Sequence, residues 1–173
     1  MCFYKKRQYI VDWGEHGFSV KFCLYRNIRK DAYPDMKALI DALNRDLASE
    51  FQAVLMYTVY SARVTGVYRP QLVQFMQAEI PDELGHAQFL ADKIAALGGI
   101  PTTEPAPVPP ANNMKEMLEN ILAAEKDAIA GYSKRAEEAR EAGEIGLSVH
   151  LETMIGDETA HYEETKKILV DWH

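Results

Sequence analysis

A proline-rich segment, GGIPTTEPAPVPPANN at residues 98–113, divides the chain and limits the folds that it can adopt. Two glycines begin the segment and five prolines follow, and proline does not fit the interior of a helix. Apolar residues recur at helical spacing on both sides, over residues 36–66, 70–97, 114–141 and 147–170. Short turns, GVYRP and AGEIG, join the first pair and the second pair of these stretches. Short turns imply antiparallel neighbours, so the pattern predicts two helix hairpins.

The predicted helices are long enough to need such a link. Each spans about 24–31 residues, or roughly 36–46 Å at 1.5 Å per residue. An extended link of about 15 residues reaches roughly 50 Å, so it can run the whole length of the helices. The sequence therefore predicts an all-α fold, a four-helix bundle in which one long crossover joins helices two and three.

Six ligand-type side chains fall on the inward stripes near the helix midpoints: Glu50, Glu83, His86, Glu125, Glu158 and His161. The two halves of the chain repeat this set, because 125 − 50, 158 − 83 and 161 − 86 all equal 75. A single Glu-x-x-His motif is a weak signal. Two copies in register, each with a mid-helix glutamate upstream, predict a symmetric site for two metal ions.

The residue types define the chemistry of this predicted site. Four glutamates supply four negative charges, which two divalent cations would neutralise. Carboxylates with neutral imidazoles suit iron or manganese, whereas zinc can bind but has no redox chemistry. Such a site favours reaction of a reduced iron pair with O2 or peroxide. The alternative is a bundle with incidental polar core residues, which would leave six buried ionisable groups unpaired at high cost.

Two aspartates share the same offset, since Asp82 and Asp157 directly precede the two Glu-x-x-His motifs. A ligating histidine commonly donates its free N–H to a carboxylate, which fixes the tautomer of the ring. Pseudo-symmetry then predicts that Asp82 reaches His161 and that Asp157 reaches His86, each across the site. Glu79, one turn before the first motif, is expected to lie in solvent or to line an entry path.

The Glu…ExxH…Glu…ExxH pattern, with near-equal spacings and a long crossover, resembles the ferritin-like superfamily. Among its members the closest resemblance is to bacterioferritin and to Dps-like cages that carry a bacterioferritin-type site, and it covers residues 36–170. The resemblance implies these ligand roles: terminal for Glu50 and Glu125, bridging for Glu83 and Glu158, and one to each iron for His86 and His161.

The resemblance also implies an activity, which is oxidation of Fe(II) by O2 or H2O2 at two iron ions for iron storage or detoxification. The alternative is a di-iron or di-manganese oxidoreductase, peroxide-scavenging or hydroxylase-like, without iron storage. Tyr57 and Tyr132, which lie two turns past the terminal glutamates and also differ by 75 residues, resemble hydrogen-bond donors that support the site from outside the ligand set. Packing in the core with some other hydroxyl partner is the alternative for these two residues.

Two departures from the family pattern set further expectations. The haem ligand of bacterioferritin is a methionine directly after the bridging glutamate of helix two. Leu84 stands at that position here, so we expect no haem. Only twelve residues follow His161, too few for the short fifth helix of the largest cages, so we expect a homo-oligomer that is a dimer or a smaller cage.

Charge divides the chain into two predicted parts, an N-terminal arm at residues 1–34 and the bundle at residues 35–173. The arm carries seven Lys/Arg and three Asp/Glu, a net of +4, whereas the whole chain is at −7 with a pI near 5.2. The overall charge argues against attraction to DNA or to acidic membranes. The arm is interpreted as a solvated or oligomer-contacting extension, or as an upstream addition to a chain that starts at Met36.

Cysteine usage and hydropathy bear on the cellular setting. Cys2 and Cys23 form no CxxC pattern, so neither a disulfide scaffold nor a thiolate zinc site is indicated. No apolar run reaches the about 18 residues that a membrane span needs. A reduced, cytoplasmic setting without a membrane partner is therefore expected.

Overall fold

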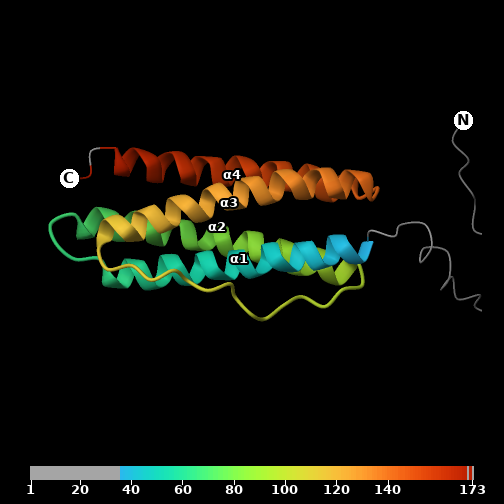
Figure 1. The fold of residues 1–173 in the computed structure, drawn as a ribbon, viewed down its shortest axis with the longest axis horizontal. Helices are drawn as coiled ribbons and strands as arrows, with labels where there is room; N and C mark the ends of the chain where they lie inside the picture. Colours follow the sequence, from blue (N-terminus) through green and yellow to red (C-terminus); the bar gives the residue numbers. More distant parts are fainter. Residues whose placement is uncertain (1–35, 171, 173) are drawn as a thin grey trace, which may run out of the picture. The chain divides into compact units, whose positions relative to one another are not determined.

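The computed structural model describes residues 36–170 and residue 172. The predicted arm at residues 1–34, with both cysteines, lies outside the described residues. Four helices make up the regular structure of the described part: α1 (Met36–Arg63), α2 (Arg69–Ala96), α3 (Met114–Glu141) and α4 (Ile145–Leu169) (Figure 1). This is the predicted all-α fold.

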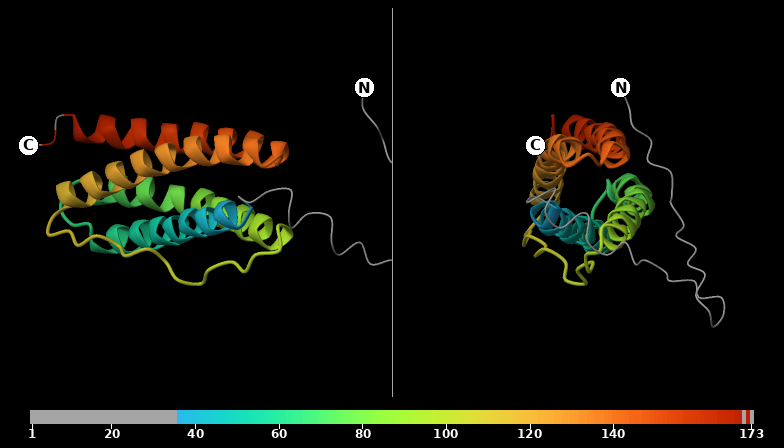
Figure 2. Two further views of the ribbon diagram at one scale, coloured as in Figure 1. Left: turned by 45° about the vertical axis from the view of Figure 1, so that its right-hand side comes forward. Right: turned by 90° about the vertical axis from the view of Figure 1, so that its right-hand side faces the viewer.

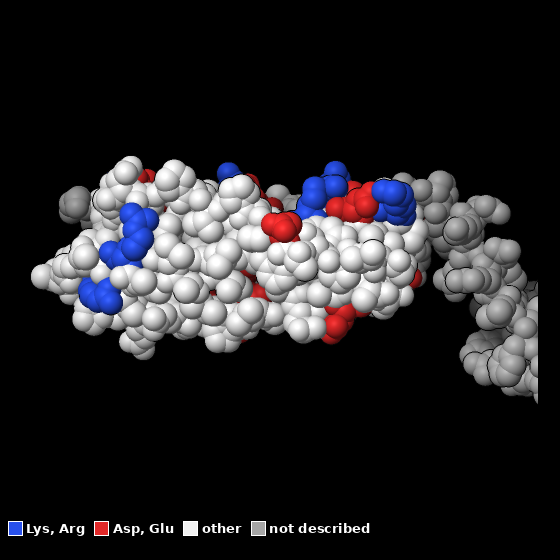
Figure 3. Space-filling model, turned by 90° about the horizontal axis from the view of Figure 1, so that it is seen from below, with Lys and Arg blue, Asp and Glu red and all other residues white. Residues whose placement is uncertain are grey.

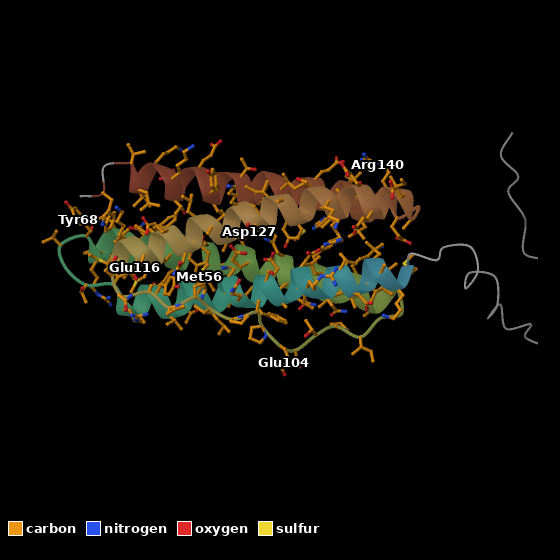
Figure 4. The ribbon with its side chains drawn as sticks, in the orientation of Figure 1. Met56, Tyr68, Glu104, Glu116, Asp127 and Arg140 are labelled. Carbon is orange, nitrogen blue, oxygen red and sulfur yellow. The ribbon has the colours of Figure 1, made fainter. Side chains whose placement is uncertain are left out.

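The turns between the helices each contain a glycine with a positive φ angle. These angles are 80° at Gly66, 84° at Gly98 and 78° at Gly143. Side chains clash in this left-handed region, so glycine is the residue that ends a helix there at least cost. At the start of α3, Asn113 accepts a hydrogen bond from the backbone N–H of Glu116 at 2.9 Å (Glu116 is labelled in Figure 4). This cap begins the helix directly after the proline-rich segment.

The long crossover decides the direction of the helices. It returns along α1 from the end of α2 to the opposite end of the bundle, where α3 begins (Figure 1). α2 and α3 therefore run parallel, while α1 with α2 and α3 with α4 form antiparallel hairpins. Backbone and side-chain groups of α1 hold the crossover: the Ala106 N–H donates to Ala48 O at 2.8 Å, and the Thr102 N–H donates to Asn44 Oδ1 at 2.7 Å.

The four helices surround a common core, as the view along the bundle shows (Figure 2, right). Within each hairpin the helices pack closely, α1 also packs on α3, and α2 has few contacts with α4. The buried apolar residues form two clusters, one around Leu43, Leu90 and Leu151 and one around Met56, Met76 and Ile121. None of the helices within residues 36–170 has the length and apolar character that crossing a membrane requires.

Gly99, where the crossover leaves α2, provides a test of this packing. A Cβ atom added there would lie 2.6 Å from Cγ2 of Ile40 and 3.0 Å from Cγ2 of Ile94. We expect Gly99→Ala to lower the free energy of unfolding by about 1–3 kcal/mol, as overpacking does. Gly156→Ala is the matched control, because no atom lies within 4 Å of its added Cβ. That change in a helix should raise the stability by about 0.5–1 kcal/mol. Urea unfolding measures both, and equal effects would contradict the proposed close approach.

Candidate metal centre

The four helices bring the six predicted ligands into one buried layer. Their exposed fractions range from 1% to 7%. Along α1 this layer lies after Leu47 of the first apolar cluster and before Met56 of the second. Each of the other helices also has one cluster on either side of its polar residues. The layer therefore lies between two apolar regions, which limit its hydration from either end.

The six side chains form two overlapping groups with metal-binding geometry. In each group the candidate ligand atoms all lie within 4.8 Å of one another. One group contains Glu50 and His86, and the other contains Glu125 and His161. Glu83 of α2 and Glu158 of α4 belong to both groups. A carboxylate shared by two groups can contact two ions at once, so the arrangement fits a pair of metals.

Buried atoms without partners test whether a metal pair fits. The Nδ1 atoms of His86 and His161 are buried and have no hydrogen-bond partner of acceptable geometry. The same holds for carboxylate oxygens of Glu50, Glu83 and Glu158. Polar atoms buried without partners are costly. Two divalent cations would coordinate all of these atoms, and this oxygen and nitrogen donor set is one that iron and manganese accept.

Glu158 lies against both imidazoles. Its Oε1 lies 2.9 Å from Nδ1 of His86, and its Oε2 lies 3.4 Å from Nδ1 of His161. Burial alone would raise the pKa of Glu158, but the two histidines outweigh burial and lower it to about 2. Burial would likewise lower the pKa of His86, but contacts with Glu158, Glu50 and Glu83 raise it to about 12. Burial would also lower the pKa of His161, but contacts with Glu158, Glu79 and Glu83 raise it.

At two other glutamates, Glu50 and Glu125, nearby groups do not offset the cost of burying a charge. Burial raises the pKa of Glu50 to about 8, although the contact with His86 works in the opposite direction. Burial also raises the pKa of Glu125 well above its usual range, and the neighbouring Glu158 adds to the effect. The ionised forms of these two carboxylates are therefore costly in the metal-free fold.

Two buried tyrosines support these same glutamates from the opposite helix. The Tyr57 hydroxyl donates to Oε1 of Glu125 at 2.6 Å, and the Tyr132 hydroxyl donates to Oε1 of Glu50. Burial and the adjacent carboxylates raise the pKa of both tyrosines, so both remain neutral donors. α1 and α3 thus each supply a glutamate and the tyrosine that holds the other glutamate.

Carboxylates also lie on the outer side of the imidazoles. Asp157 Oδ2 is 3.5 Å from Nε2 of His86, and Asp82 Oδ2 is 3.9 Å from Nε2 of His161. The nearest carboxylate to His161 is instead Glu79, whose Oε2 is 2.8 Å from Nε2. The expectation that Glu79 lies in solvent is thus wrong, because its side chain is only 16% exposed. The residue 75 positions after Glu79 is Met154, so the internal repeat did not indicate a role for Glu79.

A cavity of about 150 Å³ opens onto this layer between α1 and α3. Four of the predicted ligands, Glu50, Glu83, Glu125 and Glu158, form its inner wall. Small residues of α3, including Ala128 and Gly131, leave the space open. Its outer residues include exposed Ser49 and Asp127, and Asp127 lies near the middle of α3 in Figure 4.

The cavity also touches a buried ion pair that the sequence did not reveal. Nε of Arg135, on α3, lies 2.7 Å from Oδ2 of Asp46, on α1, and Arg135 is 6% exposed. Asp46 lines the cavity, so this pair neutralises one of its acidic residues and ties α1 to α3 beside it. Asp127 also lines the cavity, and it is not part of this ion pair.

The chain forms two helix hairpins joined by a long crossover, and it buries a layer of shared carboxylates and histidines. These features define the class of metal-binding helical bundles. Comparison with known proteins agrees. The ferritin-like domain model matches residues 40–173. A bacterioferritin of Mycobacterium tuberculosis is 30% identical over 141 residues, which cover 80% of this chain and 87% of that protein. The chain belongs to the ferritin-like family.

Two solved structures share the fold. A ferritin-like, diiron-carboxylate protein from Bacillus anthracis is 47% identical, with a TM-score of 0.78 over 79% of this chain and 99% of that chain. A dodecameric thioferritin from Bacteroides fragilis, described as bacterioferritin-related, is 26% identical, with a TM-score of 0.68 over 79% of this chain and 87% of that one. Family membership implies a metal centre, and the buried layer has the residues to hold it.

Isosteric changes at two glutamates should have opposite effects on the metal-free protein. Burial raises the pKa of Glu125, so folding at neutral pH must protonate a carboxyl group that is ionised in the unfolded chain. Glu125→Gln removes this cost and should stabilise the fold by more than about 1 kcal/mol. Glu158→Gln leaves two buried imidazolium groups without their shared counter-ion and should destabilise the fold by about 3–5 kcal/mol. Urea unfolding at pH 7 after chelation measures both. Glu137→Gln, on an exposed site of α3, is the control. Effects of the same sign would contradict this account.

Proposed function

We propose that this protein is a ferroxidase that oxidises Fe(II) with O2 or H2O2 at a di-iron site within one chain, for iron storage or detoxification. The observation that carries the proposal is the pair of overlapping ligand groups that share Glu83 and Glu158. Similarity to a diiron-carboxylate protein and to bacterioferritin supports the same reading.

The proposed reaction needs no further redox group. Two Fe(II) ions lose one electron each, and these two electrons with two protons reduce O2 to H2O2, or reduce H2O2 to two waters. Glu50 and Glu125 are proposed as terminal ligands, Glu83 and Glu158 as bridges, and His86 and His161 as one ligand to each iron. Carboxylate oxygens suit both Fe(II) and Fe(III), so the same ligands serve before and after oxidation.

The cavity between α1 and α3 supports a route to this site. About 150 Å³ is room for a few water molecules, since each takes about 30 Å³ in the liquid. O2 and H2O2 each fit in this space, and a cation fits once it has lost part of its hydration shell. Asp127 adds negative charge on the outer side, which favours entry of a cation over an anion.

Stopped-flow oxidation of Fe(II) tests the proposal. The wild-type protein should produce a ferric absorbance with O2 or H2O2 faster than buffer alone. Glu50→Ala and Glu125→Ala should slow the reaction sharply, because each removes a ligand from one ion. Glu83→Ala should weaken the binding of both ions, since that carboxylate lies in both groups.

Glu137→Ala removes an exposed glutamate of α3 and serves as the matched control, with the wild-type rate expected. Oxidation by the wild-type protein at the buffer rate with both oxidants would refute the ferroxidase proposal. So would an unchanged rate in all three ligand variants.

We also propose that the chain assembles with copies of itself through α1 and α2. The face made by α1, α2 and the crossover carries few charged side chains (Figure 3). Exposed residues from 49 to 62 of α1 and from 71 to 81 of α2 have no charge. Leu55, Val59 and Leu84 are 43–49% exposed on these helices. Protein interfaces are depleted of charge in this way, and the thioferritin from Bacteroides fragilis is described as dodecameric.

A single charge on this face should weaken assembly. Leu84→Glu would bury a carboxylate at the interface and should shift sedimentation towards smaller species. Val149→Glu makes a similar change at a side chain that is 54% exposed on α4, and it should leave the assembly intact. Sedimentation velocity distinguishes the two variants. Dissociation by Val149→Glu alone would assign the contact to a different face.

A further inference from the structure

The two proposed metal positions differ most clearly on the outer sides of their imidazoles. The terminal glutamates are matched in one respect, because a buried tyrosine hydroxyl donates to Glu50 and another to Glu125. The outer sides of the two imidazoles are not equivalent. Glu79 of α2 lies against His161, and its counterpart in the repeat is Met154, a buried apolar residue of α4.

His161 has an outer carboxylate within hydrogen-bond distance. Its Nε2 lies 2.8 Å from Oε2 of Glu79, a side chain that is only 16% exposed. Its Nδ1 points inward, 3.5 Å from Oε1 of Glu83 and 4.0 Å from Oε2 of Glu125. An acceptor on Nε2 holds the proton on that atom and leaves Nδ1 as the metal ligand, while it also fixes the plane of the ring.

His86 has a weaker support. Its Nε2 lies 3.5 Å from Oδ2 of Asp157, beyond the usual length of an N–H···O hydrogen bond. The Asp157 side chain is 52% exposed, so water competes with the imidazole for its oxygens. A contact with a half-exposed carboxylate contributes less than one that is shielded from water. The ring of His86 is therefore less firmly held than the ring of His161.

We propose that Glu79 is a positioning residue that makes the two metal positions unequal, so that a divalent transition metal fills the position of Glu125 and His161 before that of Glu50 and His86. The proposal rests on the proposed di-metal site. Glu79 acts through His161 in two ways, by ordering the imidazole and by placing an additional negative charge behind it. At the other position His86 has only the half-exposed Asp157 behind it, so both effects are weaker there.

Anaerobic titration with Co(II), followed by its visible absorption and by calorimetry, tests the order of filling. The wild-type protein should bind two equivalents in two resolved steps. Glu79→Gln should weaken the first step by about 10–100-fold, the usual effect of losing an outer carboxylate partner. Asp82→Asn makes the same charge change on the same helix, 3.9 Å from the same nitrogen, and should weaken it by less than about fivefold. Asp157→Asn should likewise have an effect below about fivefold.

Crystals grown with one equivalent of Co(II) locate the first ion directly. The anomalous peak should lie beside Glu125 and His161 in the wild-type protein and should divide between both positions in Glu79→Gln. Equal affinities with an unchanged Glu79→Gln isotherm, or a first peak beside Glu50 and His86, would overturn this inference and leave the di-metal site intact. Failure of the wild-type protein to bind Co(II) would overturn the inference together with the proposed site.

Discussion

The burial of four carboxylates and two imidazoles in one layer is the constraint on which the structure depends. Apolar clusters flank the layer on both sides, so water cannot solvate these groups from the ends of the bundle. Glu158 contacts both imidazoles, and two tyrosine hydroxyls support the terminal glutamates. Several buried oxygens and both Nδ1 atoms still have no hydrogen bond of acceptable geometry. The fold is thus built to retain groups that only cations satisfy fully.

The crossover gives this layer its arrangement. Because it returns along α1, the chain forms two equivalent hairpins, and α1 comes to pack on α3. The α1–α3 side presents carboxylates, tyrosines and the cavity. The α2–α4 side presents the imidazoles with Glu79, Asp82 and Asp157 behind them. The proposed site therefore has one side suited to the entry of small molecules and another that orients its nitrogen ligands.

Departures from the internal repeat distinguish this site from a symmetric one. The Asp46–Arg135 pair ties α1 to α3 beside the cavity, and the residues at the matching offsets are Ile121 and Tyr60, which cannot form such a pair. Glu79 has Met154 as its counterpart. The internal repeat accounts for the two matched ligand groups. The unmatched residues are those that would make the two proposed metal positions differ.

Much of this protein was determined by the sequence alone. Helical periodicity, five prolines and the turn glycines specified four helices and one crossover, because these signals are local. The proposed ligand set followed from the offset of 75 residues, since equal spacing on equal helices brings equivalent side chains to one level. Only the tertiary structure decided that Glu79 rather than Asp82 lies nearest to His161, that Arg135 pairs with Asp46, and that a cavity opens between α1 and α3. Those features depend on how each helix is rotated about its axis and on side-chain rotamers, and packing between distant segments sets both.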